Sequence, residues 1–577
     1  MKLTNLNLGL TTLFSFVTII VSAQDAHLLD GVQIHGNFDL YAQQYNKDSI
    51  IGAPIVPEKS GVNAFTNLIA TKGKFSAGVR LESYIPPVQG FDPRFGEETI
   101  GVPFRYASFT QDGLEITVGN FYEQFGNGMI LRSYEERGLG LDNAFDGARV
   151  RYSPIDGIYI KGLIGNQRFY WQKGDGIVRA FDGEIQFNEL VSKWSTSALR
   201  LSIGGSFVSK FQSGGSSSLD IPENVGGGAA RFQLNYKDFS LMGEYAFKDN
   251  DPTKSNNYIY KSGEGFFASA TYSRRGFGIN ISAKSIDNME FRSDREAGFN
   301  DLFINYLPAL SRQHTYNLAA TLYPYATQPN GEIGLQGDLI YKIKKGSKIG
   351  GKYGTTIQLN VSMINSHDRE YYADSDPEVA VELLDQQTYL PKDESRLGYK
   401  ANLFNWGSEV YYRDYNIEVD RKFNKNFKLK GTFAFQEYNI ELIQFKKFLL
   451  EPSKASTNVL ARIWVLEGLN KLSRKHSIRW EAQHLTTGQD QGDWVFGLIE
   501  YGYSPHWIVT VLNQYNYGNK NKDLRVNYPT AQVTYIHNAN RLSLGYGRQR
   551  AGIFCVGGVC RNVPAANGIT LAITSSF

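Results

Sequence analysis

The densest group of side chains that could do chemistry lies between residues 120 and 151, where arginines and carboxylates stand a few positions apart. If loop 124–142 folded into a pore, these charges would form a mixed-charge constriction, and opposed charges across a narrow pore favour polar solutes. The candidate residues are Arg132, Glu135, Glu136, Arg137 and Asp142, with Arg80, Arg149 and Arg151 extending the basic side. The alternative is an external loop whose charges are solvated.

No catalytic motif accompanies these charges. The sequence contains no G-x-S-x-G, H-E-x-x-H or P-loop pattern, and the glycine-rich stretch 126–140 lacks the strand–turn–helix setting of a nucleotide site. His484 and His537 fall in expected strands without an evident nucleophile beside them, and such a histidine is better explained as a satisfied or interfacial side chain. We therefore expect neither an enzyme nor a bound cofactor.

An acidic cluster within residues 366–405 is a weaker candidate site. Asp374, Asp376 and Glu378 could offer oxygen ligands to Ca²⁺, but the spacing lacks the glycine and the terminal glutamate of a known calcium loop. Asp376 also stands as a helix N-cap before a proline, which predicts a short helix over residues 376–385. A solvated acidic loop with a helix cap is the favoured interpretation, and no metal site is predicted.

The two cysteines of the chain, Cys555 and Cys560, flank a Gly-Gly turn just before the final strand. In an exported protein such a pair predicts a local disulfide. Closing so short a loop constrains little of the unfolded chain, so the bond would stiffen an outer loop more than it would hold the fold together. A metal site would need further ligands, which are not apparent nearby.

The elements that must position these residues have a period of two. In segments 32–43 and 75–82, apolar side chains alternate with polar ones, so that one face of each strand suits lipid and the other suits a water-filled interior. Val79, for example, lies on the opposite face from Arg80 and Glu82. Strands of roughly ten residues fit a tilted membrane crossing better than a soluble sandwich with one wet face.

The overall composition agrees with this pattern. The mean hydropathy is −0.34, yet Phe, Tyr and Trp make up 14% of the chain and glycine occurs 58 times. A transmembrane β-barrel needs apolar side chains only on the lipid-facing half of each strand, so a polar average does not exclude a membrane protein. The net charge of +3 is too small for this length to indicate a nucleic-acid partner.

Both ends of the sequence carry export signals. Residues 1–23 combine a basic start, an apolar run and a small-residue cleavage site, which predicts a removed signal peptide. The last strand is amphipathic and ends on an aromatic residue, and it resembles the signal by which Gram-negative outer-membrane barrels are recognised for assembly. The apolar residues of this assembly signal are Ile569, Leu571, Ile573 and Phe577.

Short turns rich in Gly, Asp and Pro alternate with longer polar segments, which is the rhythm of a transmembrane barrel. The pattern yields about twenty-five candidate strands, and a single-chain bacterial barrel has an even number, so we predict an all-β antiparallel barrel of about 22 to 26 strands. The excess arises between residues 314 and 343, where one candidate is not a membrane strand or two have been merged. Residues 24–577 would form this single barrel, with 366–405 as its longest extracellular loop.

Several strings in the sequence resemble known barrels. Segment 120–151 is similar to a hairpin of porin-like barrels of the alginate-export type, in which an Arg-bearing loop precedes a D-G-A strand start. The strings at 323–332, 479–494 and 546–561 resemble an uncharacterised outer-membrane barrel family of Bacteroidota. The resemblance implies an outer-membrane location, contact with its lipids, and insertion by the barrel-assembly machinery.

Two functions are compatible with such a barrel. The first is a porin-like channel for small polar or charged solutes, which would use the charged loop as its constriction. The alternative is a plugged barrel that serves as a structural or docking subunit of an outer-membrane assembly, secretion or uptake complex, with other envelope proteins as partners. Polar inward-facing positions are needed in both cases.

Overall fold

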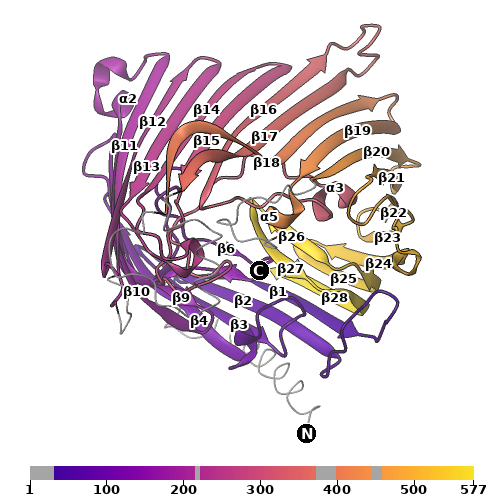
Figure 1. Cartoon of the computed structure of the whole chain (residues 1–577), viewed down its shortest axis with the longest axis horizontal. Helices are drawn as coiled ribbons and strands as arrows, with labels where there is room; N and C mark the ends of the chain where they lie inside the picture. The colour runs from indigo at the N-terminus through magenta and orange to yellow at the C-terminus, as the bar shows by residue number, and fades with distance from the viewer. Residues whose placement is uncertain (1–30, 215–220, 372–397, 445–457) are drawn as a thin grey trace.

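The computed structural model describes residues 31–214, 221–371, 398–444 and 458–577, and it forms one closed barrel (Figure 1). Its wall is a single 24-stranded antiparallel sheet, so the predicted fold class and even strand number are confirmed. The wall strands are β1 Gln33–Tyr45, β2 Ser60–Lys72, β3 Phe75–Tyr84, β4 Ile100–Gln111, β5 Leu114–Phe121, β8 Phe145–Tyr152, β9 Ile158–Phe169, β10 Gln172–Gln186, β11 Leu199–Phe211, β12 Asn224–Tyr236, β13 Phe239–Lys248, β14 Gly263–Arg274, β15 Phe277–Asp287, β16 Gly331–Ile343, β17 Thr355–Tyr371, β18 Tyr399–Lys422, β19 Phe427–Tyr438, β20 Val459–Lys471, β21 His476–Thr486, β22 Trp494–Tyr503, β23 Trp507–Asn516, β24 Asn527–His537, β25 Asn540–Gln549 and β28 Ala566–Ser576.

The remaining elements are short and lie in the connections. Two small hairpins pair β6 Glu135–Glu136 with β7 Leu141–Asp142, and β26 Gly552–Val556 with β27 Val559–Val563. The helical turns are α2 Phe187–Leu190, α3 Asn317–Thr321, α5 Ile440–Ile443, η3 Pro93–Gly96, η4 Ser192–Trp194, η5 Lys254–Asn256 and η7 Lys522–Leu524. Among the described residues, no helix has the length and apolar character of a membrane span.

The barrel closes where the first wall strand meets the last. β1 pairs with β28 in antiparallel register, with Leu40 opposite Ile573. At the end of this seam, Gly36 and Phe577 exchange two backbone hydrogen bonds, with N···O distances of 2.9 and 3.0 Å. The sheet therefore has no unpaired edge at this seam, as a spanning barrel requires.

Alternation along each strand sends one set of side chains outward and the other into the lumen. In β3, Val79 is 46% exposed on the outer surface, whereas Arg80 and Glu82 are buried on the inner side. The faces predicted for this strand are thus confirmed. Outward-facing aliphatic and aromatic residues recur around the wall, including Phe207, Trp464, Ile499, Val511 and Leu544, and they form the apolar outer surface that contact with lipid requires.

The connections differ between the two ends of the barrel. Tight turns close one end, such as Asp112–Gly113 between β4 and β5, where Gly113 has a φ of +77°. We call this the short-turn end and its opposite the long-loop end. Residues 314–330 contain no wall strand, and β16 begins only at Gly331, so the excess candidate of the sequence pattern came from this segment.

The extent of the loops differs from the prediction. Strands β17 and β18 extend into range 366–405, which leaves 372–398 as their connection, and the connection 288–330 is longer. Range 366–405 is therefore not the longest loop. The helix predicted at 376–385, the weak metal candidates Asp374, Asp376 and Glu378, and the signal peptide at 1–23 all lie outside the described residues.

Candidate functional site

Loops from the long-loop end pack together inside the barrel (Figure 1). We call loops 122–144, 288–330 and 550–565 together the plug. The first two are joined by backbone hydrogen bonds, from Arg132 N to Ile304 O at 2.8 Å and from Tyr306 N to Gly128 O at 2.9 Å. Because these bonds join loops that are far apart in sequence, the plug is one packed unit.

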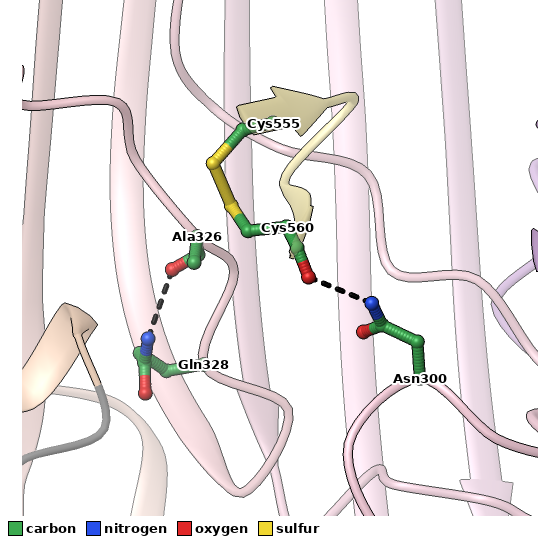
Figure 2. Close-up of a disulfide and its surroundings, with 5 residues drawn as sticks. All are labelled: Asn300, Ala326, Gln328, Cys555 and Cys560. Carbon is green, nitrogen blue, oxygen red and sulfur yellow. Dashed lines mark hydrogen bonds between the residues drawn. A yellow bond between two sulfur atoms is a disulfide. The ribbon is translucent and has the colours of Figure 1, made fainter. Parts of the chain in front are cut away.

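The third plug loop is the hairpin formed by β26 and β27. Cys555 and Cys560 face each other in this hairpin and are joined by a disulfide (Figure 2). Asn300 Nδ2 donates to the carbonyl oxygen of Cys560 at 2.7 Å, and Thr327 N donates to Gly558 O at 3.0 Å. Loop 288–330 thus contacts both other loops of the plug.

One side of the plug is held by apolar contacts with β10 to β15. Met129, Ile130 and Leu131 are fully buried in loop 122–144. They share a hydrophobic cluster with inward-facing residues of the wall, among which Val178 and Val208 are also fully buried. Such residues are incompatible with a water-filled lumen at this level, so the inner wall is built to be covered here.

The opposite side of the plug packs on β17 to β24. Leu318 and Tyr323, around α3, belong to a second hydrophobic cluster with Ile463 of β20 and Trp494 of β22. The side-chain oxygen of Gln483 in β21 accepts a hydrogen bond from Leu318 N at 2.9 Å. The inner wall is therefore apolar on both sides of the plug, in contrast to the uniformly polar interior expected from the alternation.

Away from the plug, the inner wall is polar. Inward-facing residues near the short-turn end form ion pairs along the wall. Arg479 lies 2.5 Å from Glu481, and Lys430 lies 3.5 Å from Glu418. The barrel interior therefore has a polar half toward the short turns and a loop-filled half toward the long loops.

A buried ionic network fixes loop 122–144 to the wall, and it contains two of the predicted constriction residues. Arg168 bridges Glu82 and Asp142 with N–O distances of 2.6 Å each, while Arg80 pairs with the same two carboxylates. All of these side chains are at most 8% exposed. They hold the loop in place against the wall.

The charges around Asp142 keep it ionised. Burial alone would raise its pKa, but Arg168 and Arg80 outweigh burial, so the pKa of this carboxyl lies below the usual value of 3.8. Its Oδ1 atom also accepts hydrogen bonds from Tyr122 OH and Ala144 N, both at 3.0 Å. Asp142 is therefore charged at neutral pH.

Other predicted constriction residues remain partly exposed, and one of them, Glu135, also pairs with Arg80 of the buried network at 3.1 Å. Arg137 pairs with Glu135 at 2.8 Å and with Asp39 of β1. Arg132 stacks on Tyr306, with its guanidinium carbon 4.1 Å from the ring centre. Glu136 Oε1 accepts a hydrogen bond from the backbone nitrogen two residues further on.

Arg149 and Arg151 form a group of their own on β8. Both pair with Glu123, which lies 2.8 Å from Arg151 and 3.1 Å from Lys161. Glu115 of β5 pairs with Arg149 as well. The eight predicted residues therefore lie near one another on one side of the interior, but they do not form a single ring.

The sequence did not predict the residues that complete these groups, namely Glu82, Glu123 and Arg168. Glu82 stands two positions after Arg80 on the same strand face, so its role could have been recognised from the alternation. Arg168 and Glu123 have no such local signal, because their partners come from distant segments. Within the described part of the chain, no group of His, Cys, Asp and Glu side chains is arranged to hold a metal ion.

The predicted assembly residues lie on one face of β28. Ile569, Leu571 and Ile573 alternate along the strand, and Leu571 pairs with Leu544 of β25, an outward-facing residue. Phe577 follows directly after the strand and is 58% exposed. These side chains are placed on the outer surface, and their recognition during assembly stays a prediction.

A cavity of about 880 Å³ lies among the plug loops and is bounded by all three of them. Four arginines line it: Arg94, Arg168, Arg550 and Arg561. Burial lowers the pKa of both Arg550 and Arg561, and guanidinium groups remain charged despite such shifts. The cavity is therefore a chamber among the plug loops whose lining includes charged arginines.

Comparison with solved structures returns other large barrels. The P pilus usher (PapC) translocation pore is 8% identical, with 94% of this chain and 98% of that chain covered and a TM-score of 0.40. A BenF-like porin from Pseudomonas fluorescens Pf-5 is 9% identical, with coverages of 82% and 98% and a TM-score of 0.32. The copper transporter OprC is 11% identical, with coverages of 95% and 80% and a TM-score of 0.35.

No curated protein matches the sequence. A family model, described as "Family of unknown function (DUF6029)", matches residues 5–577. This match spans the whole barrel wall and every loop of the plug. The chain therefore belongs to the Family of unknown function (DUF6029).

Proposed function

We propose that this protein is an integral outer-membrane barrel that is closed at rest by its own plug and that admits a specific solute when the plug moves. In this proposal the apolar outer surface contacts outer-membrane lipids, the barrel-assembly machinery inserts the chain, and the long-loop end faces outward. A permanently open porin for small solutes is the less favoured form of the same transport function.

One observation carries the proposal: inward-facing apolar side chains of the wall are buried beneath the plug. Ile463 and Trp494 on one side, and Val178 and Val208 on the other, are almost fully buried. Exposing each such side chain to water would cost about 1.5–3 kcal/mol. An interior that was permanently open at this level would be expected to carry polar residues there instead.

A second candidate is a plugged docking subunit of an envelope complex. It is favoured by Ile55, which is 75% exposed, and by Ile50, which is 61% exposed, both in the loop between β1 and β2 at the long-loop end. Exposed apolar residues on a loop outside the lipid region suit a protein partner. Stoichiometric co-purification of another envelope protein, lost on changing both residues to Ser, would support this candidate.

Conductance in planar bilayers tests the closed barrel. We expect the wild-type protein to give no stable conductance steps, because the plug fills the long-loop half of the lumen. Replacing residues 290–328 with a short Gly/Ser linker should produce large steps. A matched control shortens the connection 345–352 at the short-turn end and should stay closed.

Folding of each variant is checked by heat-modifiable migration on gels. Stable wild-type steps as large as those of the linker variant would overturn the closed-barrel proposal and favour an open porin. A linker variant that folds but stays closed would equally contradict it.

A further inference from the structure

The cavity among the plug loops carries positive charge that the described residues do not neutralise. Its three lining carboxylates are outnumbered by its four arginines: Asp92 and Asp301 share Arg94, at 2.7 and 3.1 Å, and Asp142 is bound by Arg168. Arg550 and Arg561 also line the cavity, and neither forms a salt bridge with a carboxylate in the described parts of the chain.

Arg550 lies at the base of the β26–β27 hairpin. One terminal nitrogen donates to the backbone oxygen of Thr321 at 2.6 Å, and the other donates to Ala551 O at 2.9 Å. Its Nε atom is buried and has no hydrogen-bond partner among the described residues. Asp490 attracts this guanidinium group electrostatically but forms no salt bridge with it. The group is held directly only by neutral oxygens, and a buried charge of this kind is costly unless an anion pairs with it.

Arg561 lies further along the same hairpin, opposite Phe554 in the β26–β27 register. Its Nε donates to Gly138 O at 2.6 Å, and one terminal nitrogen donates to Gly90 O at 3.2 Å. Its guanidinium carbon lies 4.5 Å from the ring centre of Phe91. Arginine carries five N–H donors, and the two carbonyl oxygens use only part of them. The second terminal nitrogen of Arg561 can therefore donate to a ligand.

An exposed aromatic residue completes the lining. Phe299 is 88% exposed although it belongs to the plug, and its backbone φ is +49°. A bulky residue in this left-handed region is strained. Its carbonyl oxygen is held by Arg292 at 2.7 Å, so the surrounding loop fixes this conformation, and Phe299 is among the residues that line the cavity.

We propose that this cavity binds an anionic solute whose carboxylate or phosphate groups pair with Arg550 and Arg561 and whose apolar part contacts Phe299. The cavity volume lies within the range of sites for small organic ligands, about 300–1,000 Å³. Arginine is suited to both anions, because its planar fork forms bidentate pairs with either group. This inference rests on the proposed uptake function and names the class of solute.

Equilibrium binding to the full-length protein in detergent tests the site. The probes are citrate and inorganic triphosphate, with raffinose as a neutral probe of similar size. We expect saturable binding of at least one anion and none of raffinose. Preference for citrate would identify a carboxylate solute, and preference for triphosphate would identify a phosphate solute.

Variants locate the binding. Arg550→Gln and Arg561→Gln should each weaken anion binding about 10- to 100-fold, as expected for loss of a charge-assisted hydrogen bond. Arg550→Lys keeps the charge but not the fork, so its loss should be smaller. Arg525→Gln is the matched control, because Arg525 is an exposed arginine at the same end and lies outside the cavity.

The outcomes separate this inference from the closed-barrel function. Absence of saturable anion binding, or equal losses in Arg525→Gln and the cavity variants, would overturn the anion site. If the same preparations remain non-conducting, the closed-barrel proposal stands. Conversely, intact anion binding in a barrel that conducts freely would overturn only the closed-barrel proposal.

Discussion

Lys284 and Glu332 form a fully buried ion pair, with 2.5 Å between Nζ and Oε1, across the two neighbouring strands that loop 288–330 connects. Lys284 also donates to the carbonyl oxygen of Pro308 within that loop. Glu332 accepts hydrogen bonds from Gln328 N and from Tyr325 OH. The pair therefore ties the base of the longest plug loop to the wall.

Removing one partner of this pair should release the loop. Glu332→Gln leaves Lys284 buried without a counter-charge, which typically costs about 3–5 kcal/mol. We expect a lower melting temperature and new conductance steps in bilayers. Glu500→Gln, on the polar part of the wall, is the control and should change neither. Unchanged stability of Glu332→Gln would show that Lys284 finds another partner.

The pH dependence of the plug should follow Asp142. Its pKa is depressed in the folded state, so the stability that it contributes is present above the usual value of 3.8 and is lost as the pH falls through the depressed value. Backbone hydrogen exchange in loop 122–144, corrected for intrinsic rates, should stay slow at neutral and mildly acidic pH and accelerate only below 3.8. Asp142→Asn should accelerate it already at neutral pH. If hydrogen exchange in the wild-type loop accelerated near pH 6, a group other than Asp142 would control the stability of the loop.

Phe577 closes the seam through its backbone, and its ring is the predicted assembly signal. The two roles can be tested separately. Phe577→Ala keeps the backbone hydrogen bonds of the seam and removes only the ring. If the ring is read during insertion, this variant should lower the amount of assembled barrel in the outer membrane several-fold. Phe239→Ala, an outward-facing aromatic away from the seam, should have little effect. Normal levels of Phe577→Ala would show that recognition does not need the ring.

The disulfide between Cys555 and Cys560 can be checked by the mass of the peptide that contains it. An unreduced peptide spanning residues 554–561, from protein isolated in its native envelope, should be lighter by two hydrogens than the reduced one. Changing both Cys555 and Cys560 to Ser should reduce the free energy of unfolding by at most about 2 kcal/mol, because the closed loop is short. Alkylation of both cysteines without reductant would contradict the bond.

The sequence predicted the wall well because alternation is a local signal. The segment around Val79 and Arg80 shows lipid-facing and inward-facing residues directly, and the same alternation indicated the barrel. The even strand number came from the general rule for single-chain bacterial barrels. The strand at 459–465 reads V-L-A-R-I-W-V, with apolar residues on both faces. This pattern fits the covered inner face that the structure shows there, and the prediction of a polar interior did not use it.

The plug could not be predicted from local alternation, because its contacts join segments that are distant in the sequence. Arg168 of β9 meets Asp142 of loop 122–144, and Tyr306 of loop 288–330 meets Gly128 of loop 122–144. Neither pairing has a periodic signature. The role of the charges in segment 120–151 as a constriction stays a prediction. The structure pairs Asp142 of this segment with Arg80 of β3, and Arg550 and Arg561 lie far away in the sequence.

The two ends of loop 288–330 leave the wall at one point, because Asp287 and Gly331 are paired directly between β15 and β16. A segment anchored at adjoining strands can swing out as a hinged flap without breaking any strand pairing in the ring. For the same reason it can be exchanged for a segment of another length while the wall stays unchanged. The plug loop and the barrel wall can therefore vary independently of each other in this protein.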